Sequence, residues 1–377
     1  MGERGVGRTS AAVVLVITTF VVTGGVLTAC GSDNNRATST TAIWGVSAGT
    51  VPCGGKRALT AEGSTAQQNA IASFNHVWDQ LCPGKNVSYN PTGSGAGRAQ
   101  FIAGHVDFAG SDSPLTSDQI GPVAKRCNGN PAWDLPLVFG PIALVYNLAG
   151  LQTLVVNGDV LAKIFSGVIT NWNDQIIAAL NPGVALPDSK ITPIYRADSS
   201  GTTDNLQRYL TADAPESWTK GVGTEFQGGV GEGVEKSAGV VQAVQTTPGA
   251  IGYVEKGFAD RAGLPFVQID TGNGGVPLND DTARSAVNLA NFVASGNDLV
   301  LDLNAMYNSQ DPGAYPLVMG TYEIVCSAGY DPDTGAAIKS FLTVAATSGQ
   351  TGLSSAGYVP MPDKVKERLL SAINALQ

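Results

Sequence analysis

Residues 58–81 read ALTAEGSTAQQNAIASFNHVWDQL. Ala58–Ala61 is a short strand-like segment, and the apolar residues of the second half recur at a helical spacing. Gly63 turns the chain between the two segments, Ser64 is a good N-cap, and Gln67 follows three residues later, as in a capping box. The stretch therefore predicts a strand that passes directly into a helix beginning at Ser64.

The start of such a helix has a chemistry of its own. Its first amides have no hydrogen-bond partner within the helix, and the helix dipole makes that end positive. A helix start that follows a strand can therefore hold an anion. The simpler alternative is that Ser64 caps its own helix, and one junction taken alone favours that role.

The same arrangement recurs twice in the chain. Two further strand-like segments lead through loops rich in glycine, serine and threonine into helix-like segments: Val87–Asn90 through TGSGAG (92–97) to 98–102, and Ile191–Arg196 through ADSSGTT (197–203) to 204–210. Glycine lets the backbone approach a ligand closely and turn its amides toward it. Because ligands of open α/β sheets bind at the carboxyl ends of the strands, three such junctions predict an α/β fold with an anion cradle at that edge.

Two charged residues are expected at the same edge of the sheet, at the carboxyl ends of the strands. Residues 106–115 form another short strand that runs into a turn and carries Asp112; capping of the following Ser-Pro segment is the alternative role of this side chain. Arg196 ends an otherwise apolar strand, where a charge needs a partner. Asp198 is the nearby candidate for that partner.

Taken together, these motifs resemble those of the phosphate-binding protein of the bacterial Pst-type phosphate transporter, in an actinobacterial branch. The resemblance extends from about residue 57 to residue 365 and keeps order and spacing. The matching motifs are GST at 63–65, GSGAG at 93–97, DFAGSD at 107–112, IFSG at 164–167, WND at 172–174, LNPG at 180–183, RADSSGT at 196–202 and PGAIGYVE at 248–255. It implies a two-lobed periplasmic-binding-protein fold of type II, in which each lobe is a three-layer α/β sandwich.

The resemblance also implies the binding residues. Asp198 matches an aspartate that holds the binding arginine in place. The family often has an aromatic residue where this chain has Ala66, but that contact is made through the backbone amide, so the change should matter little. No catalytic residue, metal or cofactor is implied. The residues expected to bind phosphate are Thr65, Ala66, Ser94, Asp112, Arg196, Ser200, Gly201 and Thr202.

The chain is expected to cross twice between the lobes. The crossings are placed near Pro136–Phe139, where the sequence is extended and rich in proline, and near Tyr315–Leu317. Lobe I would then comprise residues 51–137 and 317–377, and lobe II residues 138–316. The binding residues divide between the two lobes, so phosphate would bridge the cleft and favour a closed form by hinge motion.

The N-terminal segment carries an export signal. Two arginines precede AAVVLVITTFVV at residues 11–22, which is too short to span a bilayer comfortably. LTAC at residues 27–30 resembles a bacterial lipobox, which implies cleavage after residue 29 and a lipid on Cys30. Residues 30–50 would then be a flexible tether, with the folded part starting near Val51. The alternative is a plain signal peptide in which Cys30 is incidental.

Four cysteines remain after Cys30. In an exported chain an even number suggests two disulfides, with three possible connectivities. A metal site is disfavoured, because no Cys-x-x-Cys spacing occurs and both histidines lie apart from the cysteines. We pair the cysteine before the first strand with the one that ends the first helix, both away from the cleft, and the other two in lobe I. The predicted disulfides are Cys53–Cys82 and Cys127–Cys326.

Composition excludes several classes of protein. The net charge of −9 and the absence of a basic stripe argue against nucleic acid as a partner. Gly93-Ser94-Gly95 lacks the G-x-S-x-G spacing of a hydrolase, and only two histidines are present to act as a base. We therefore expect a monomeric receptor on the outer face of the cell membrane that captures inorganic phosphate and delivers it to the permease of an ABC transporter. The alternatives are a receptor for another oxyanion or, less favoured, a phosphoester hydrolase.

Overall fold

The computed structural model describes residues 51–377. The expected signal segment, the lipid site at Cys30 and the tether lie outside these residues, so they stay predictions. Across the described part of the chain, no helix combines the length and the apolar character needed to cross a membrane.

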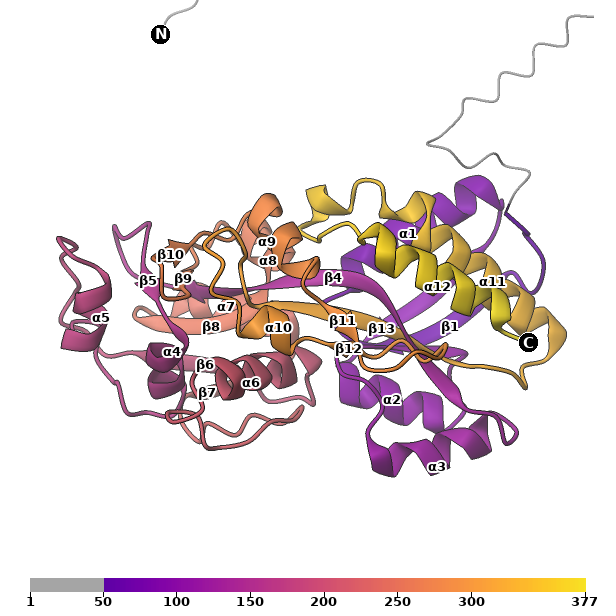
Figure 1. The fold of residues 1–377 in the computed structure, drawn as a ribbon, viewed down its shortest axis with the longest axis horizontal. Helices are drawn as coiled ribbons and strands as arrows, with labels where there is room; N and C mark the ends of the chain where they lie inside the picture. Colours follow the sequence, from indigo (N-terminus) through magenta and orange to yellow (C-terminus); the bar gives the residue numbers. More distant parts are fainter. Residues whose placement is uncertain (1–50) are drawn as a thin grey trace, which may run out of the picture. The chain divides into compact units, whose positions relative to one another are not determined.

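A mixed sheet of eight strands forms the centre of the fold, in the order β2-β1-β3-β13-β4-β8-β6-β7. The central strands β13 and β4 run antiparallel to each other and to their outer neighbours, whereas β1 is parallel to β2 and β3, and β6 is parallel to β7 and β8. Two parallel half-sheets are thus joined by two antiparallel strands (Figure 1). The strands are β1 (Ala58–Gly63), β2 (Asn86–Pro91), β3 (Phe108–Ser111), β4 (Ala132–Tyr146), β6 (Thr192–Arg196), β7 (Glu232–Val234), β8 (Ala250–Glu255) and β13 (Val318–Cys326).

Strand β4 belongs to both half-sheets. It pairs with β13 from Ala132 to Pro141 and with β8 from Ile142 to Tyr146. We call lobe I the part built on β2, β1 and β3, and lobe II the part built on β8, β6 and β7. The change of partner lies slightly later in the chain than the first crossing expected from the sequence, and the residue limits of the lobes stay a prediction. The pairing of β13 with β4 shifts register between Thr321 and Tyr322.

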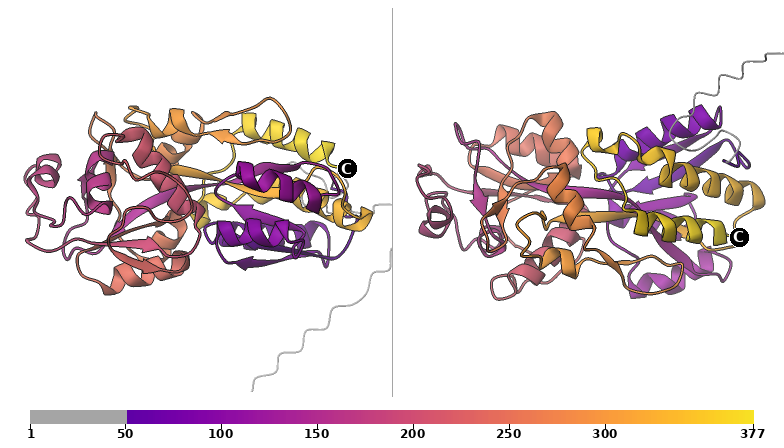
Figure 2. Two further views of the ribbon diagram at one scale, coloured as in Figure 1. Left: turned by 90° about the horizontal axis from the view of Figure 1, so that it is seen from below. Right: turned by 45° about the horizontal axis from the view of Figure 1, so that its top comes forward.

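Helices cover both faces of lobe I (Figures 1 and 2). Helices α1 (Gln68–Leu81), α11 (Pro332–Ala346) and α12 (Asp363–Ala375) lie on one face, and α2 (Ser94–Ile102) and α3 (Ser117–Arg126) lie on the other. The Phe341 ring of α11 packs against Phe74 and Trp78 of α1 and stacks on Phe108 of β3. This aromatic cluster fixes the first helical layer on the sheet and completes a three-layer sandwich.

Lobe II has the same layered construction. Adjacent residues of β8 face opposite sides: a side chain added at Gly252 would meet Val240 of α7, whereas the Tyr253 ring packs on Phe165 of α4. Because strand side chains alternate, α7 and α4 cover opposite faces of this half-sheet. The helices here are α4 (Gly158–Phe165), α5 (Gln175–Leu180), α6 (Gly201–Asp213), α7 (Lys236–Thr246) and α8 (Lys256–Ala262).

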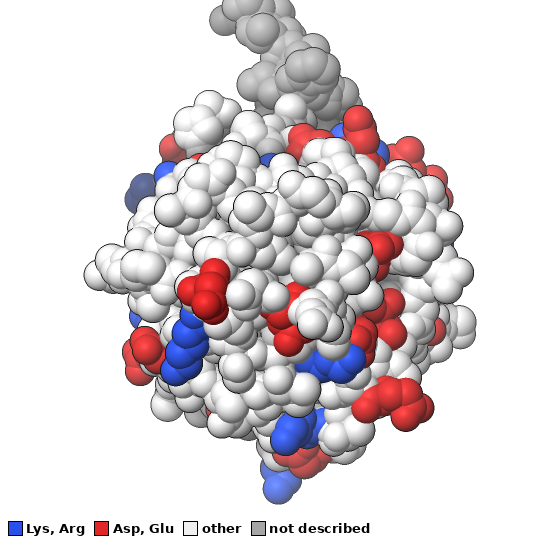
Figure 3. Space-filling view, turned by 90° about the vertical axis from the view of Figure 1, so that its left-hand side faces the viewer, with Lys and Arg blue, Asp and Glu red and all other residues white. Residues whose placement is uncertain are grey.

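Short elements complete the fold. Strands β5, β9 and β10 form a small sheet in the order β10-β9-β5, and β11 pairs with β12. Their bounds are β5 (Val155–Val156), β9 (Gln268–Asp270), β10 (Gly275–Val276), α9 (Asp280–Val287), β11 (Asn291–Phe292), β12 (Leu301–Asp302), α10 (Asn304–Tyr307), and the 3-10 turns Ser348–Gln350 and Leu353–Ala356. On the face of lobe II in Figure 3, acidic and basic side chains are interspersed on a mostly uncharged surface.

The first helix begins later than the sequence predicts. Helix α1 starts at Gln68, and the Ser64 hydroxyl accepts from the Ala66 amide (3.1 Å) in a local turn instead of capping the helix. The expected capping box is wrong because the Gln67 side chain turns into the interior, where it donates to the Tyr89 hydroxyl (3.1 Å). The other two helices begin earlier than predicted, α2 at Ser94 and α6 at Gly201.

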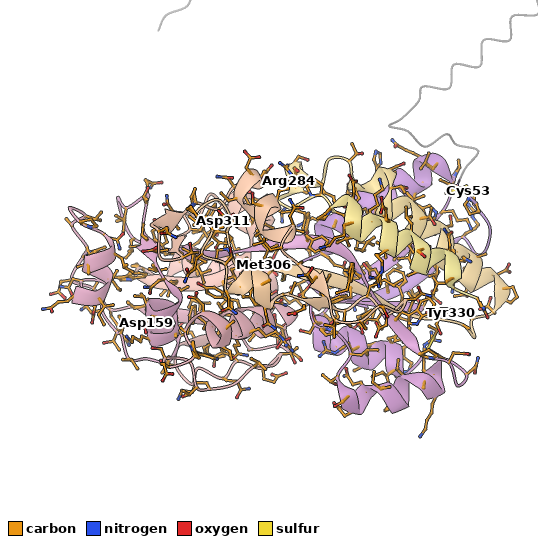
Figure 4. All side chains as sticks on the ribbon, in the orientation of Figure 1. Cys53, Asp159, Arg284, Met306, Asp311 and Tyr330 are labelled. Atoms are coloured by element: carbon orange, nitrogen blue, oxygen red, sulfur yellow. A yellow bond between two sulfur atoms is a disulfide. The ribbon has the colours of Figure 1, made fainter. Side chains whose placement is uncertain are left out.

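Both predicted cysteine pairs are disulfides in the structure. Cys53–Cys82 ties the segment before β1 to the end of α1, and Cys127–Cys326 ties the end of α3 to the end of β13. Figure 4 places Cys53, and Tyr330 whose hydroxyl accepts from the Cys326 amide (3.0 Å), at the side of lobe I away from lobe II. The disulfides therefore brace lobe I without touching the region where the lobes meet.

Candidate functional site

The lobe I part of the site forms where β1, β2 and β3 end together. The Ser64 amide donates to the Gly110 carbonyl (2.8 Å), and the Gly93 amide donates to the Gly63 carbonyl (2.8 Å). These bonds bring the loops after the three strands side by side. The Ser94 hydroxyl then accepts from the Asp112 amide (3.1 Å) and lies 3.3 Å from the Asp112 carboxylate.

Asp112 is held in place from the central strand of the sheet. Its Oδ1 accepts from the Thr321 hydroxyl of β13 (2.8 Å), and the residue is only 3 % exposed. Burial raises the pKa of Asp112, against the hydrogen bonds from Ser64 and Thr321 and the charge of Arg196, which lower it. The role considered from sequence, capping of the next segment, is not the one observed: the carboxylate faces the site.

The lobe II part of the site contains a buried ion pair. Arg196 ends β6, as expected, and its Nε donates to Asp198 Oδ1 (2.7 Å) while a terminal nitrogen reaches the other carboxylate oxygen. Asp198 also accepts from the Lys236 amide (2.9 Å). Burial acts to raise the pKa of Asp198, but the bonds and charge of Arg196 outweigh it, so the pKa lies below its ordinary value. The carboxylate therefore stays ionised and fixes the guanidinium plane.

The start of α6 supplies further donors. Ser200 is the N-cap, and its hydroxyl accepts from the Thr203 amide (3.3 Å). The amides of Gly201 and Thr202 lie in the first turn, where no acceptor within the helix exists. The Thr202 hydroxyl is buried and has no hydrogen-bond partner among the described residues. Since such groups are costly to leave unpaired, this hydroxyl is available to a ligand.

The two lobes meet around these groups. A Cβ added at Gly201 would lie 2.6 Å from both Asp112 Cβ and Ser94 Oγ, which shows how closely α6 approaches lobe I. All eight residues expected from the sequence are buried in this region. Four hydrogen bonds cross between the lobes here: Gly95 N to Ser199 O (3.0 Å), Asn205 Nδ2 to Asp112 O (2.7 Å), Ser113 Oγ to Asp204 Oδ2 (2.7 Å), and Thr65 Oγ1 with Ser237 Oγ (2.8 Å).

Several residues at this junction were missed by sequence reasoning. Asn205 and Thr321 hold Asp112, and Tyr253 accepts from the Arg196 amide (3.1 Å). Ser237 faces Thr65 at the start of α7. The only sequence signal for Ser237 is a fourth strand-to-helix junction, and that junction lacks the glycine-rich loop that marks the others.

A pocket of about 330 Å³ lies next to the site. Of the eight expected residues only Asp112 lines it, and its other walls include Asp204, Asn205, Arg208 and Tyr307. The pocket is therefore a neighbour of the site and not the site itself. Within residues 51–377 no group of histidine, cysteine, aspartate and glutamate side chains is placed to hold a metal ion.

The arrangement has a definite chemical preference. Hydroxyls, first-turn amides and the Arg196 guanidinium are donors, and the Asp112 carboxylate beside them only accepts when ionised. Such a set suits a small tetrahedral oxyanion that carries negative charge and retains one proton.

Relatives of the chain agree with this geometry. A family model described as a PBP superfamily domain matches residues 33–348. The phosphate-binding protein PstS3 of Mycobacterium bovis is 47 % identical over 353 residues, which cover 93 % of this chain and 95 % of that protein. The chain belongs to the PstS family of phosphate-binding proteins. The PstS 2 protein of Mycobacterium tuberculosis is 45 % identical over 355 residues (93 % and 95 %), and the PstS protein of Methanocaldococcus jannaschii is 31 % identical over 334 residues (84 % and 85 %).

The fold of the chain is also similar to those of solved phosphate-binding proteins. A high-affinity periplasmic phosphate-binding protein called PfluDING, bound with phosphate, superimposes with a TM-score of 0.68 at 21 % identity, covering 83 % of this chain and 93 % of that one. A phosphate-binding protein of Stenotrophomonas maltophilia gives a TM-score of 0.63 at 18 % identity, covering 84 % and 94 %. The two-lobed periplasmic-binding-protein fold predicted from the sequence is thereby confirmed.

Proposed function

We propose that this chain binds inorganic phosphate between its lobes and delivers it to the permease of a phosphate ABC transporter. One observation carries the proposal: the start of α6, where the Thr202 hydroxyl is buried and unpaired among the described residues, lies against Ser94 and the buried Asp112 of the other lobe. The names of the PstS relatives support the same ligand.

The proposed contacts divide between the lobes. Lobe I would bind phosphate with two hydroxyls, one amide and the Asp112 carboxylate, which accepts the proton that phosphate retains. Lobe II would bind it with the Arg196 guanidinium and the start of α6. The full set is Thr65, the Ala66 amide, Ser94, Asp112, Arg196, Ser200, Gly201 and Thr202, with Asp198 holding the arginine.

Local contacts allow an acidic protein to bind an anion. The net charge of −9 acts at long range and is screened within roughly 10 Å at moderate salt. Hydrogen bonds to a charged group contribute about 1.5–3 kcal/mol each. Several of them exceed the ~8 kcal/mol that corresponds to micromolar affinity, even after the cost of ordering the lobes.

The same proposal includes hinge closure. Residues 51–137 with 317–377 would move against residues 138–316, because the only sheet connections between the half-sheets in the described chain run through β4 and β13. The four hydrogen bonds described above at the site would then form on closure and break on opening.

We also propose that the protein acts as a monomer outside the membrane, anchored by a lipid on Cys30, without catalytic activity. The likeness of its fold to a periplasmic protein supports an extracytoplasmic location. Replacing Cys30 with alanine should release the protein from membranes, and failure of labelled fatty acid to enter the wild-type chain would refute the anchor.

Calorimetry across a panel of anions tests the binding function. Phosphate should bind with micromolar affinity or tighter, and sulfate should bind far more weakly because it has no proton for Asp112. Incubation with a chromogenic phosphoester should release no product above background. Tighter binding of another oxyanion, or turnover of the ester, would overturn the proposal.

A further inference from the structure

Helix α7 begins at the junction of the lobes. Its first residue, Lys236, has a φ of +65°, which is rare for a residue with a side chain. In this conformation the Lys236 amide reaches Asp198 Oδ1 (2.9 Å), and the next residue, Ser237, reaches across to lobe I. Ser237 is 1 % exposed, and its Oγ lies 2.8 Å from Thr65 Oγ1.

Either hydroxyl of this pair could be the donor, so the direction of the bond depends on what else each group contacts. Each hydroxyl has one proton to donate and can accept as well. Among the described residues, neither Ser237 Oγ nor Thr65 Oγ1 has another hydrogen-bond partner. The Thr65 proton is free to point into the site only if Ser237 donates to Thr65. If Thr65 instead donated to Ser237, it would turn a lone pair toward the anion.

We propose that Ser237 is a positioning residue, which donates to Thr65 so that Thr65 donates to the bound phosphate. This inference rests on the function proposed above. The start of α7 would then support one binding group from each lobe, because the Lys236 amide holds Asp198, the partner of Arg196. Because the contact joins the two lobes, hinge opening would separate Ser237 from Thr65, and its contribution would belong to the closed complex.

The location of this contact predicts a kinetic signature. Phosphate first meets the open lobes, where Ser237 is distant from Thr65, so the association rate should not depend on Ser237. Release requires the closed lobes to open, so loss of the Ser237 hydroxyl should increase the release rate. A residue that merely packed the fold would instead change the stability of the unliganded protein.

The decisive experiment compares Ser237→Thr with Ser237→Val, which have the same shape and differ by the hydroxyl. The valine variant should bind phosphate about 5- to 15-fold more weakly than the threonine variant, as expected for one lost hydrogen bond. Stopped-flow measurements should assign that loss to faster release. Ser117→Ala, at the exposed first residue of α3, is the matched control and should bind like wild type.

A double-mutant cycle with Thr65→Val then tests whether Ser237 affects phosphate binding through the Thr65 hydroxyl. Replacing Ser237 should cost little further affinity once the Thr65 hydroxyl is gone. Equal phosphate affinity of the Ser237→Thr and Ser237→Val variants would overturn the inference, as would a cost that is unchanged in the Thr65→Val background. A wild-type protein that fails to bind phosphate would reject the proposed function as well, so the two failures are distinguishable.

Discussion

Replacement of Gly201 by alanine should block closure of the lobes without disturbing either lobe. Gly201 is the first residue of α6, and its φ is not in the left-handed region, so alanine introduces no backbone strain. The added methyl group would lie 2.6 Å from Asp112 Cβ and 2.6 Å from Ser94 Oγ, both on the opposite lobe. The amide that faces the site is kept, so the change tests distance alone.

The size of the effect follows from these contacts. Ordinary contacts begin at 3.4 Å, so the lobes must separate by roughly 1 Å at this point. That shift would stretch the bond from Asn205 to Asp112 from 2.7 Å beyond the range of a good hydrogen bond. Together with weakened bonds to the anion, at about 1.5–3 kcal/mol each, a loss of about 3–5 kcal/mol is expected, which is roughly 10²- to 10³-fold or more in affinity.

Calorimetry with phosphate measures this loss, and thermal unfolding without phosphate checks that the variant is folded. Gly121→Ala in α3 is the matched control: it also has an ordinary φ, and no heavy atom lies within 4 Å of the added Cβ. The control should keep wild-type affinity. If Gly201→Ala binds phosphate within a few-fold of wild type, the closed arrangement seen here is not the phosphate-bound state, and the reasoning is refuted.

Three other changes separate the roles of charge, burial and covalent bracing. Asp112→Asn should bind phosphate comparably or somewhat less tightly and bind sulfate ~10²- to 10⁴-fold better than wild type in competition titrations, because the amide can donate to sulfate where the carboxylate repels it. Arg196→Ala should weaken the binding of both anions. If Asp112→Asn still excludes sulfate, Asp112 does not discriminate between the two anions. Burial raises the pKa of Glu323 from 4.5 to about 8. Between these two pH values Glu323 keeps its proton in the native state and loses it in the unfolded state, so the free energy of unfolding should fall as the pH rises from 4.5 to about 8. Glu323→Gln should flatten this slope in denaturant titrations between pH 5 and pH 9, and an unaltered slope would contradict the assignment. Replacing Cys127 and Cys326 with serine should lower the free energy of unfolding by about 2–4 kcal/mol and leave phosphate affinity intact; weaker binding would show that the brace reaches the site.

The features that sequence predicted well are local ones. The strand-to-helix junctions are read from adjacent residues, and Arg196 and its partner Asp198 are two residues apart. Helix boundaries were less accurate where a distant group intervened: Gln67 leaves the predicted capping box because Tyr89 of β2 binds its side chain.

Contacts between the lobes were beyond sequence reasoning. Asn205 lies 93 positions from Asp112, and Ser237 lies 172 positions from Thr65. No periodicity or spacing relates such residues, because they meet only through the folding of the whole sheet. The resemblance to a family supplied the binding residues on each lobe but not the side chains that hold them in position.

The shared strand β4 determines how this receptor can open. The continuous strand β4 pairs with β13 in its first part and with β8 in its second part. Separation of the lobes must therefore twist the ribbon formed by β4 and β13, because no flexible loop replaces this connection. The free-energy cost of opening is then distributed over many residues of these two strands. The register shift in β13 adjoins Thr321, whose hydroxyl binds Asp112, so the ribbon is irregular at the point where it touches the site. Twisting of the ribbon and retention of the anion are thus mechanically linked, and the stiffness of β4 and β13 becomes one of the quantities that set the rate of release.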